Sequence, residues 1–319
     1  MKMLSSHLLI LILGLAGLWL GSDLIVRGAI KIAKRIGLSQ TFIGLTILAL
    51  GTDFPEIMVA INGAIQQQQG AHTAELVVGN IVGSNMAQIS LVLGFTGLIS
   101  VLRIQKKDTV KNGLMLIATT LLLFITALDG FISPTDGLIM VIFYLAYFLS
   151  LRQKTQLSKA KGQLRRIFKK QSMIPMLQLM IGLLIIAKAS NCVVDSGVAI
   201  SEIMGISQMI VGVLLIGLGT SLPELMVSLT AVLKGSKGLS MGNLIGSNIV
   251  DILLALGGSA MLGGWRVERS IATFDLAYLL FTSVVVVLFL LTKQKLERKE
   301  SFLILSLYGI YLSLKVLGF

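Results

Sequence analysis

Ten long apolar stretches divide this 319-residue chain, and each is about as long as a helix that crosses a lipid bilayer. Hydrophobic residues make up 55% of the sequence and charged residues only 13%, with a mean hydropathy of +0.90. A soluble domain carries about 25% charged residues. The stretches are unbroken, whereas the strands of a membrane barrel alternate apolar and polar residues. The sequence therefore predicts an all-α integral membrane protein, with ten transmembrane helices over residues 7–27, 40–65, 75–101, 112–128, 133–151, 173–197, 207–233, 239–262, 272–292 and 301–318.

The positive charge of the chain follows the predicted membrane topology. The net charge is +12, and 22 of the 27 lysines and arginines fall in five groups that lie in alternate loops. Basic loops of membrane proteins face the cytoplasm. We therefore expect a multi-pass protein of the cell (plasma or inner) membrane with both termini outside, and no binding of nucleic acid. The five basic groups lie at residues 27–35, 103–111, 152–170, 234–237 and 293–299.

Two blocks of sequence occur twice in the chain. Residues 39–56 match 207–224 at eight of 18 positions, and residues 79–94 match 242–257 at nine of 16. Each half then has five helices, and an odd number makes the second half enter the membrane from the opposite side. Such inverted-topology repeats are typical of secondary transporters, which bind their substrate between the repeats. The predicted organisation is a first five-helix repeat at 1–151, a basic cytoplasmic linker at 152–172 and a second five-helix repeat at 173–319.

Four acidic residues, Asp53, Glu56, Glu224 and Asp251, lie inside predicted membrane helices. A charged side chain at the centre of a bilayer costs at least about 2.5–3.5 kcal/mol, so such acids are candidates for function. Lys188 is the only basic residue within a helix at comparable depth. One lysine cannot neutralise four acids, whereas a bound cation can. The sequence therefore predicts a cation site.

Hydroxyl and amide side chains accompany the acids at helical spacing. Residues four apart lie on the same face of a helix, as do residues three apart. Asp53 and Glu56 are therefore expected to share one face. The pairs at a spacing of four are Thr52 and Glu56, Ser84 and Gln88, Thr220 and Glu224, and Ser247 and Asp251.

Prolines and glycines near these positions are expected to shape the site. Pro55 and Pro223 lie within predicted helices, and each should free the carbonyl group four residues earlier. Free carbonyls at membrane depth are tolerated where they line a cavity. Gly83 and Gly246 are expected to let other helices approach closely.

The ligand chemistry favours a hard cation. Ca²⁺ takes six to eight oxygen ligands in flexible geometry, and the absence of His and Cys from the predicted cage argues against zinc or copper. Carboxylates that lie this close together cannot all stay ionised when the site is empty. One ion should therefore leave only as another arrives, which is the basis of obligatory exchange. The expected ions are Ca²⁺ and Na⁺, with H⁺ or K⁺ as alternative coupling ions, and no cofactor is expected.

The paired motifs resemble the alpha repeats of the sodium/calcium exchanger branch of the cation/Ca²⁺ exchangers. The resemblance covers essentially the whole chain, and it implies a compact prokaryotic member with alpha motifs at 39–94 and 207–257. It also implies exchange of Ca²⁺ for Na⁺ by alternating access, in which helices 1 and 6 slide over the other eight. The motifs that carry it are Gly51-Thr52-Asp53-Phe54-Pro55-Glu56 with Gly83-Ser84-Asn85, and Gly219-Thr220-Ser221-Leu222-Pro223-Glu224 with Gly246-Ser247-Asn248-Ile249-Val250-Asp251.

The same resemblance implies roles for single residues. Glu56 and Glu224 would be the central Ca²⁺ ligands, and Thr52 and Thr220 would add backbone carbonyl groups. The flanking Na⁺ sites would be formed by Ser84, Ser221, Ser247 and Asp251.

Two positions depart from the family pattern. Asp53 stands where the family usually has Ser, and Gln88 stands where Asn or Asp is usual. The first adds a charge, and the second adds a methylene group that pushes the amide further into the cage. Four acids instead of three leave the Na⁺ stoichiometry open and could admit K⁺, a coupled proton or a changed divalent preference. We hypothesise that Asp53 is protonated in some states.

Three other functions compete with this interpretation. A Ca²⁺/H⁺ antiporter on the same scaffold is the nearest, although hydroxyl-rich flanking sites favour Na⁺. A cation channel usually builds its pore from symmetric subunits, and a broken-helix site within one chain does not fit that pattern. An enzyme is not expected, because no nucleophile and base stand together in the sequence. No feature indicates an obligatory protein partner.

Overall fold

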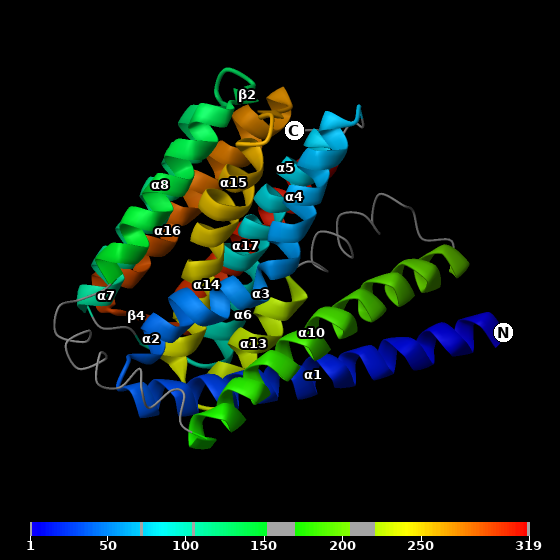
Figure 1. The fold of residues 1–319 in the computed structure, drawn as a ribbon, viewed down its shortest axis with the longest axis vertical. Coiled ribbons are helices and arrows are strands. Elements are labelled where there is room, and N and C mark those ends of the chain that lie inside the picture. The colour runs from blue at the N-terminus through cyan, green and yellow to red at the C-terminus, as the bar shows by residue number, and fades with distance from the viewer. Residues whose placement is uncertain (1, 71–72, 104–105, 152–169, 205–220, 318–319) are drawn as a thin grey trace.

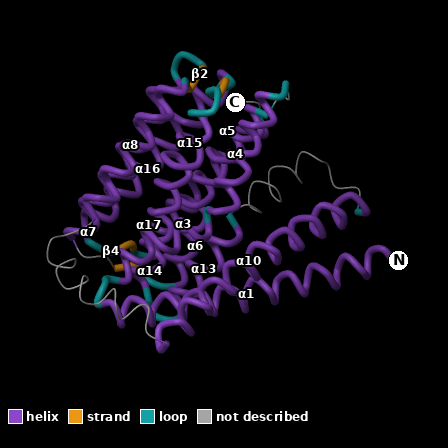
Figure 2. Tube along the Cα trace, viewed as in Figure 1, coloured by secondary structure: helices purple, strands orange, loops and turns teal. Residues whose placement is uncertain are grey.

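The computed structural model describes residues 2–70, 73–103, 106–151, 170–204 and 221–317 (Figure 1). Helices dominate these residues, and the strands are four pieces of two residues each, as the tube in Figure 2 shows. The predicted all-α class is thereby confirmed. In chain order the elements are α1 (Lys2–Ile36), α2 (Gln40–Ile43), η1 (Gly44–Leu48), α3 (Ala49–Thr52), α4 (Phe54–Gln68), α5 (Ala74–Met86), η2 (Ala87–Val92), α6 (Leu93–Ile99), β1 (Leu102–Arg103), α7 (Lys106–Ala127), β2 (Phe131–Ile132), α8 (Pro134–Leu151), α10 (Lys170–Ile203), α13 (Leu222–Leu233), α14 (Lys237–Val250), η4 (Asp251–Leu256), α15 (Gly257–Ala260), β3 (Trp265–Arg266), η5 (Ile271–Asp275), α16 (Leu276–Lys293), β4 (Lys295–Leu296) and α17 (Arg298–Val316), where η marks a π-helical segment.

Among the described residues, seven helices are long and apolar enough to cross a bilayer, or eight if the bent helix from α2 to α4 is one span. The predicted helices at 7–27 and 173–197 are longer than expected, because α1 covers 35 residues and α10 covers 34. Most of the predicted seventh helix, residues 207–220, lies outside the described part of the chain, and α13 follows it. The count of ten transmembrane helices stays a prediction.

The second predicted helix is broken at Asp53. The segments before and after this residue meet at 46°, and Asp53 itself has φ −83° and ψ 1°. Pro55 stands in the first turn of α4, where a missing N–H group costs no helical hydrogen bond. In the second half, Ser221 has a similar backbone conformation, with φ −89° and ψ 3°, and Pro223 stands in the first turn of α13. Pro55 therefore begins a new helix after the break at Asp53, and Pro223 stands at the start of the described helix α13.

Helices α1 and α10 form an antiparallel pair that runs obliquely across the rest of the bundle (Figure 1). Glycines bring the two backbones together: a Cβ atom at Gly28 would lie 2.7 Å from the carbonyl oxygen of Pro175, and one at Gly182 would lie 2.8 Å from that of Gly21. The apolar residues beneath the pair form a core of their own, separate from the main core. The two helices are therefore one structural unit.

A second close contact joins α14 to the first part of the broken helix. A Cβ atom at Gly44 would lie 2.5 Å from the carbonyl oxygen of Leu239, and one at Gly246 would lie 2.8 Å from the Cβ atom of Ala49. The expectation of a close approach at Gly246 is therefore confirmed. At Gly83 a Cβ atom would meet none of the described residues within 4 Å, and residues 205–220, the counterpart of the segment that Gly246 contacts, lie outside them, so the expectation for Gly83 stays a prediction.

Short strands and ion pairs bring several basic loops to one end of the molecule. Strand β1 pairs antiparallel with β4, which joins the second and fifth basic groups. The Nζ atom of Lys237 donates to the carbonyl oxygen of Val101 at 2.7 Å, and Lys234 pairs with Asp23 at 2.6 Å. Strands β2 and β3 pair in the same way at the opposite end, as Figure 2 shows. The gathering of the basic loops agrees with the predicted topology.

Candidate functional site

The four acids of the repeated motifs are buried together between helices. Asp53, Glu224 and Asp251 are completely buried, and Glu56 is 4% exposed. Each of the four carboxyl groups interacts electrostatically with the other three. Since like charges repel most strongly in a medium of low dielectric constant, this arrangement is unfavourable without a cation or proton.

The two broken helices present two of these acids at helix starts. Glu56 lies in the first turn of α4, and Glu224 lies in the first turn of α13. The start of a helix carries a partial positive charge and free N–H groups, which favour a carboxylate there. The breaks at Asp53 and Ser221 therefore position one glutamate from each half of the chain. Because the helix is broken at Asp53, the spacing of Asp53 and Glu56 does not place them on one continuous helical face.

Hydrogen bonds connect the remaining polar residues to Asp251. The amide nitrogen Nε2 of Gln88 donates to Oδ2 of Asp251 and to Oγ of Ser84, at 3.2 and 3.1 Å. The amide nitrogen Nδ2 of Asn85 donates to the same Oδ2 atom at 3.2 Å. The hydroxyl groups of Ser84 and Ser221 lie 3.1 Å apart. Ser84 and Gln88, predicted to share a face, are thus in direct contact, and they link α13 to α14.

Two asparagines to which the sequence analysis assigned no role take part in this network. Asn85 donates to Asp251, and Nδ2 of Asn248 donates to Oε1 of Gln88 at 2.9 Å. They orient the carboxyl group and the amide on which the predicted site depends. Their place in the repeated Gly-Ser-Asn motif was the signal that could have identified them.

Two of the site residues belong to π-helical turns. Gln88 lies in η2, and Asp251 begins η4. A π-helical turn contains an extra residue, changes the direction in which side chains point, and is frequent at functional sites. Regular helical spacing therefore does not hold beyond these residues.

Several buried oxygen atoms of the site have no hydrogen-bond partner among the described residues. A buried polar atom without a partner costs about 1–3 kcal/mol, and a charged one costs more. In the part of the chain that the structure describes, no ion pair involves the four acids, and Lys188 is exposed. These atoms can therefore serve as ligands. They are Oδ2 of Asp53, Oε2 of Glu56, Oε1 and Oε2 of Glu224, Oγ of Ser247 and Oδ1 of Asp251.

A cation at this centre needs mixed ligands. Within the described ranges, no three His, Cys, Asp or Glu side chains are arranged to hold a metal ion by themselves. Hydroxyl, amide and carbonyl oxygen atoms would have to complete the shell, and Ca²⁺ and Na⁺ accept all of these. Thr52 is buried and its hydroxyl group donates to the carbonyl oxygen of Leu48 at 3.1 Å. Thr220 lies outside the described residues.

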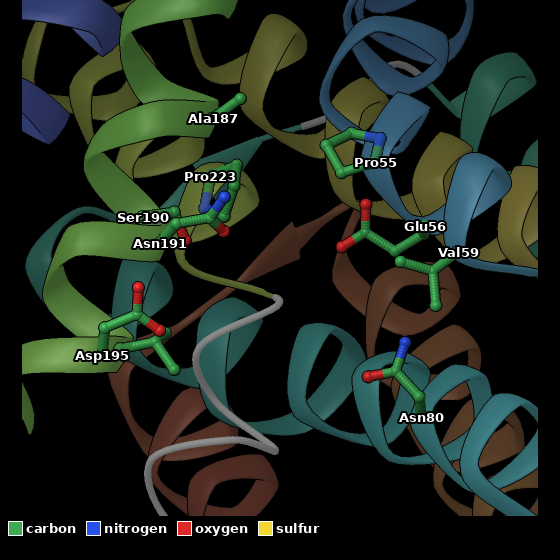
Figure 3. A pocket seen from close by; sticks show the side chains of 10 residues that line it. Pro55, Glu56, Val59, Asn80, Ala187, Ser190, Asn191, Asp195 and Pro223 are labelled. Carbon is green, nitrogen blue, oxygen red and sulfur yellow. The ribbon is translucent and has the colours of Figure 1, made fainter. Parts of the chain in front are cut away.

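A cavity of about 190 Å³ lies beside Glu56. In Figure 3, Glu56 and Asn80 point towards α10, from which Asn191 and Asp195 face them. Pro55 and Pro223 also line the cavity, so it touches both helix breaks. Of the four acids, Glu56 is the one that lines this cavity among the described residues.

A buried group of carboxyl, hydroxyl and amide oxygens between broken helices is typical of a membrane transporter for small cations. The chain belongs to the sodium/calcium exchanger family, because the model of the "Sodium/calcium exchanger protein" family matches residues 6–151 and 174–317. It is therefore a multi-pass membrane transporter of the exchanger type.

Individual relatives agree with this assignment over nearly the whole chain. The sodium/calcium exchanger MaX1 of Methanosarcina acetivorans is 28% identical over 353 residues, which cover 97% of this chain and 98% of that protein. The uncharacterized membrane protein MJ0091 of Methanocaldococcus jannaschii is 33% identical over 300 residues, 94% of each chain. The solved structure of the sodium-calcium exchanger NCX_Mj, soaked with 10 mM Na⁺ and zero Ca²⁺, has a TM-score of 0.82 at 30% identity and covers 98% of this chain and 99% of that one.

Proposed function

We propose that this protein is a secondary active antiporter that exchanges Ca²⁺ for Na⁺ across the cell membrane by alternating access. The observation that carries the proposal is the group of four mutually interacting buried acids with unpartnered oxygen atoms. The ions bind in a cage of carboxyl, hydroxyl, amide and backbone oxygens. Its members are Thr52, Asp53, Glu56, Ser84, Gln88, Thr220, Ser221, Glu224, Ser247 and Asp251.

In this proposal Ca²⁺ binds between Glu56 and Glu224, and Na⁺ binds at the flanking hydroxyl and amide groups. An empty cage leaves buried negative charge uncompensated, which costs several kcal/mol per ion. The protein therefore changes its access from one side of the membrane to the other only when either Ca²⁺ or Na⁺ fills the cage. This requirement couples the two fluxes.

The proposed architecture consists of ten transmembrane helices in two inverted repeats, at 1–151 and 173–319, joined by a cytoplasmic linker. Helices α1 and α10 correspond in the two repeats and run antiparallel, as inversion requires. The backbone conformations at Asp53 and Ser221 are nearly the same. The gap between the two segments that match the family falls on the linker. Both termini lie outside the cell.

The relatives support the choice of ions. MaX1 is named a sodium/calcium exchanger, and NCX_Mj was studied as a sodium-calcium exchanger with Na⁺, Ca²⁺ and Sr²⁺. The site of this chain offers the oxygen ligands that such ions need.

Purified protein in proteoliposomes tests the proposal. An outward Na⁺ gradient should drive ⁴⁵Ca²⁺ uptake at least tenfold above the rate with equal Na⁺ on both sides. Vesicles loaded with K⁺ or with acidic buffer, each without Na⁺, measure the alternative couplings. Uptake driven only by the proton gradient would move the assignment to a Ca²⁺/H⁺ antiporter. Uptake with no counter-ion and linear voltage dependence would indicate a channel.

The additional acid, Asp53, favours proton participation as a second candidate. It is completely buried, and Thr52 offers its Oδ1 atom only a 3.5 Å contact. We predict that the exchange rate depends on pH between about pH 5 and 8, because protons compete with cations for four crowded carboxyl groups. Asp53→Asn removes one of these groups and should flatten the pH profile, measured as ⁴⁵Ca²⁺ uptake at each pH. Identical, flat profiles for wild type and variant would refute a protonated Asp53.

A further inference from the structure

Beyond the cage itself, the 190 Å³ cavity brings together polar side chains that the proposed site does not use. Asn191 and Asp195 lie four residues apart on α10, and they face Asn80 of α5 across the cavity (Figure 3). Glu56 forms the inner end of this space and is the one member that also belongs to the cage. Its Oε2 atom is buried and has no hydrogen-bond partner among the described residues.

Three polar side chains of the cavity, those of Asn80, Asn191 and Asp195, have no structural partner among the described residues. Within the described parts of the chain, Asn80, Asn191 and Asp195 form no side-chain hydrogen bond or ion pair, and Asp195 is exposed. A carboxyl group on a membrane-spanning helix is costly and marks an ion pathway or a binding site when it faces a cavity. Asp195 meets that description.

At the corresponding position of the first repeat, the acidic side chain is held in ion pairs. The aligned motifs place Gly51 opposite Gly219, an offset of 168 residues, and the same offset places Asp23 opposite Asn191 and Arg27 opposite Asp195. Asp23 is held by Arg27 and by Lys234, each at 2.6 Å. The position on α1 therefore carries a satisfied, net positive group, and its counterpart on α10 carries a carboxyl group without a partner among the described residues. This asymmetry shows that Asp195 is not a remnant of a shared structural ion pair.

We propose that Asp195, with Asn191 and Asn80, forms a second cation site that captures Ca²⁺ in the cavity before it reaches Glu56. This inference rests on the proposed function, and it adds residues that determine affinity on one side of the membrane. The ligands are again oxygen atoms, and the single charge makes the site weaker than the cage. Ca²⁺ released from Asp195 moves inward to Glu56, whose carboxyl group faces the same space.

Capture at the mouth of a pathway has a definite kinetic signature. A negative charge there raises the local concentration of divalent cations and hence the apparent affinity for Ca²⁺. It does not act in the conformational change that moves the bound ion across the membrane. Its effect weakens as ionic strength rises, because exposed charges are screened. Asp195→Asn should therefore raise the KM for Ca²⁺ on the side of the cavity about 3- to 10-fold at low ionic strength. The maximal rate should stay within twofold of wild type.

The experiment is Na⁺-driven ⁴⁵Ca²⁺ exchange in proteoliposomes, with Ca²⁺ varied on each side in turn and with low and high concentrations of choline chloride. Glu75→Gln is the matched control, because it removes one exposed acid at the start of α5 without touching the cavity. Asp195→Glu keeps the charge and should retain a KM near that of wild type. Asn191→Asp adds a charge and should lower the KM. Elution from a sizing column and the melting temperature establish that each variant is folded.

Four outcomes separate the possibilities. A raised KM on one side only, which disappears at high ionic strength, supports the capture site. Equal KM values for Asp195→Asn and Glu75→Gln overturn it, and so does a fall in the maximal rate at unchanged KM, which would place Asp195 in the conformational change. If the wild-type protein carries no Ca²⁺ under any gradient, the proposed function itself fails and the capture site falls with it.

Discussion

Replacement of Glu224 by Gln is expected to lower Na⁺-driven ⁴⁵Ca²⁺ uptake at least 100-fold. Glu224 is completely buried, and both of its carboxyl oxygens lack a hydrogen-bond partner among the described residues. Gln has nearly the same shape, so the change removes one negative charge and leaves the packing intact. Since a divalent ion in a low-dielectric site gains several kcal/mol from each carboxylate, the loss of one ligand charge should abolish useful binding. Glu56→Gln should have an equally large effect.

Thermal unfolding separates loss of binding from loss of folding. A ligand that binds only the folded protein stabilises it by about 2.7 kcal/mol at 100 times its Kd. Ca²⁺ should therefore raise the melting temperature of the wild type but not that of Glu224→Gln. Without ions the variant should melt at the same temperature or higher, because an uncompensated buried charge has been removed. Glu75→Gln, at an exposed position, should behave as wild type. Normal uptake by Glu224→Gln would contradict the proposed cage.

Gly242→Ala is expected to destabilise the protein strongly, whereas Gly83→Ala should not. A Cβ atom at Gly242 would overlap the carbonyl oxygen of Thr41 and would lie 3.0 Å from the Cα atom of Gly44. Both neighbours are backbone atoms, which cannot move aside without separating α14 from the broken helix. Overpacking of this kind costs about 1–3 kcal/mol or more. At Gly83 a Cβ atom would meet none of the described residues within 4 Å.

The measurement is the melting temperature of the purified variants in detergent. One kcal/mol corresponds to about 2–4 °C in a protein of 150–250 residues. Gly242→Ala should therefore melt several degrees below wild type, and Gly83→Ala should match it or exceed it, because Ala favours a helix over Gly by about 1 kcal/mol. Equal melting temperatures for the two variants would show that α14 does not pack on the first part of the broken helix as described.

Much of the fold could be predicted from the sequence, because membrane helices are defined by composition alone. The helices at 112–128 and 133–151 have ends within a few residues of those observed in α7 and α8, except that α7 begins earlier. The lengths of α1 and α10 could not be predicted, since both helices continue past the apolar stretch into polar sequence. The pairing of β1 with β4 depends on loops that meet only after the bundle has formed.

The candidate site, too, could be predicted from the sequence only in part. Asp53, Glu56, Glu224 and Asp251 stood out in the sequence because acids are costly in a membrane. A broken helix with a freed carbonyl group was expected near Pro55, but the exact break at Asp53 and the π-helical turns at Gln88 and Asp251 were not expected. Both depend on how neighbouring helices pack, which the local sequence does not specify.

The backbone contacts between α1 and α10 have a mechanical consequence. Glycines at positions 21, 28 and 182 bring the backbones of the two helices close together, and the apolar residues beneath the pair form one core. We expect the two helices to move together as one rigid unit, in which Asp23 and Asp195 lie at different levels along the helix axes. A tilt of this rigid unit would move its two ends in opposite directions. Under the proposed alternating access, access to the site from the two sides of the membrane would then change in one movement of α1 and α10.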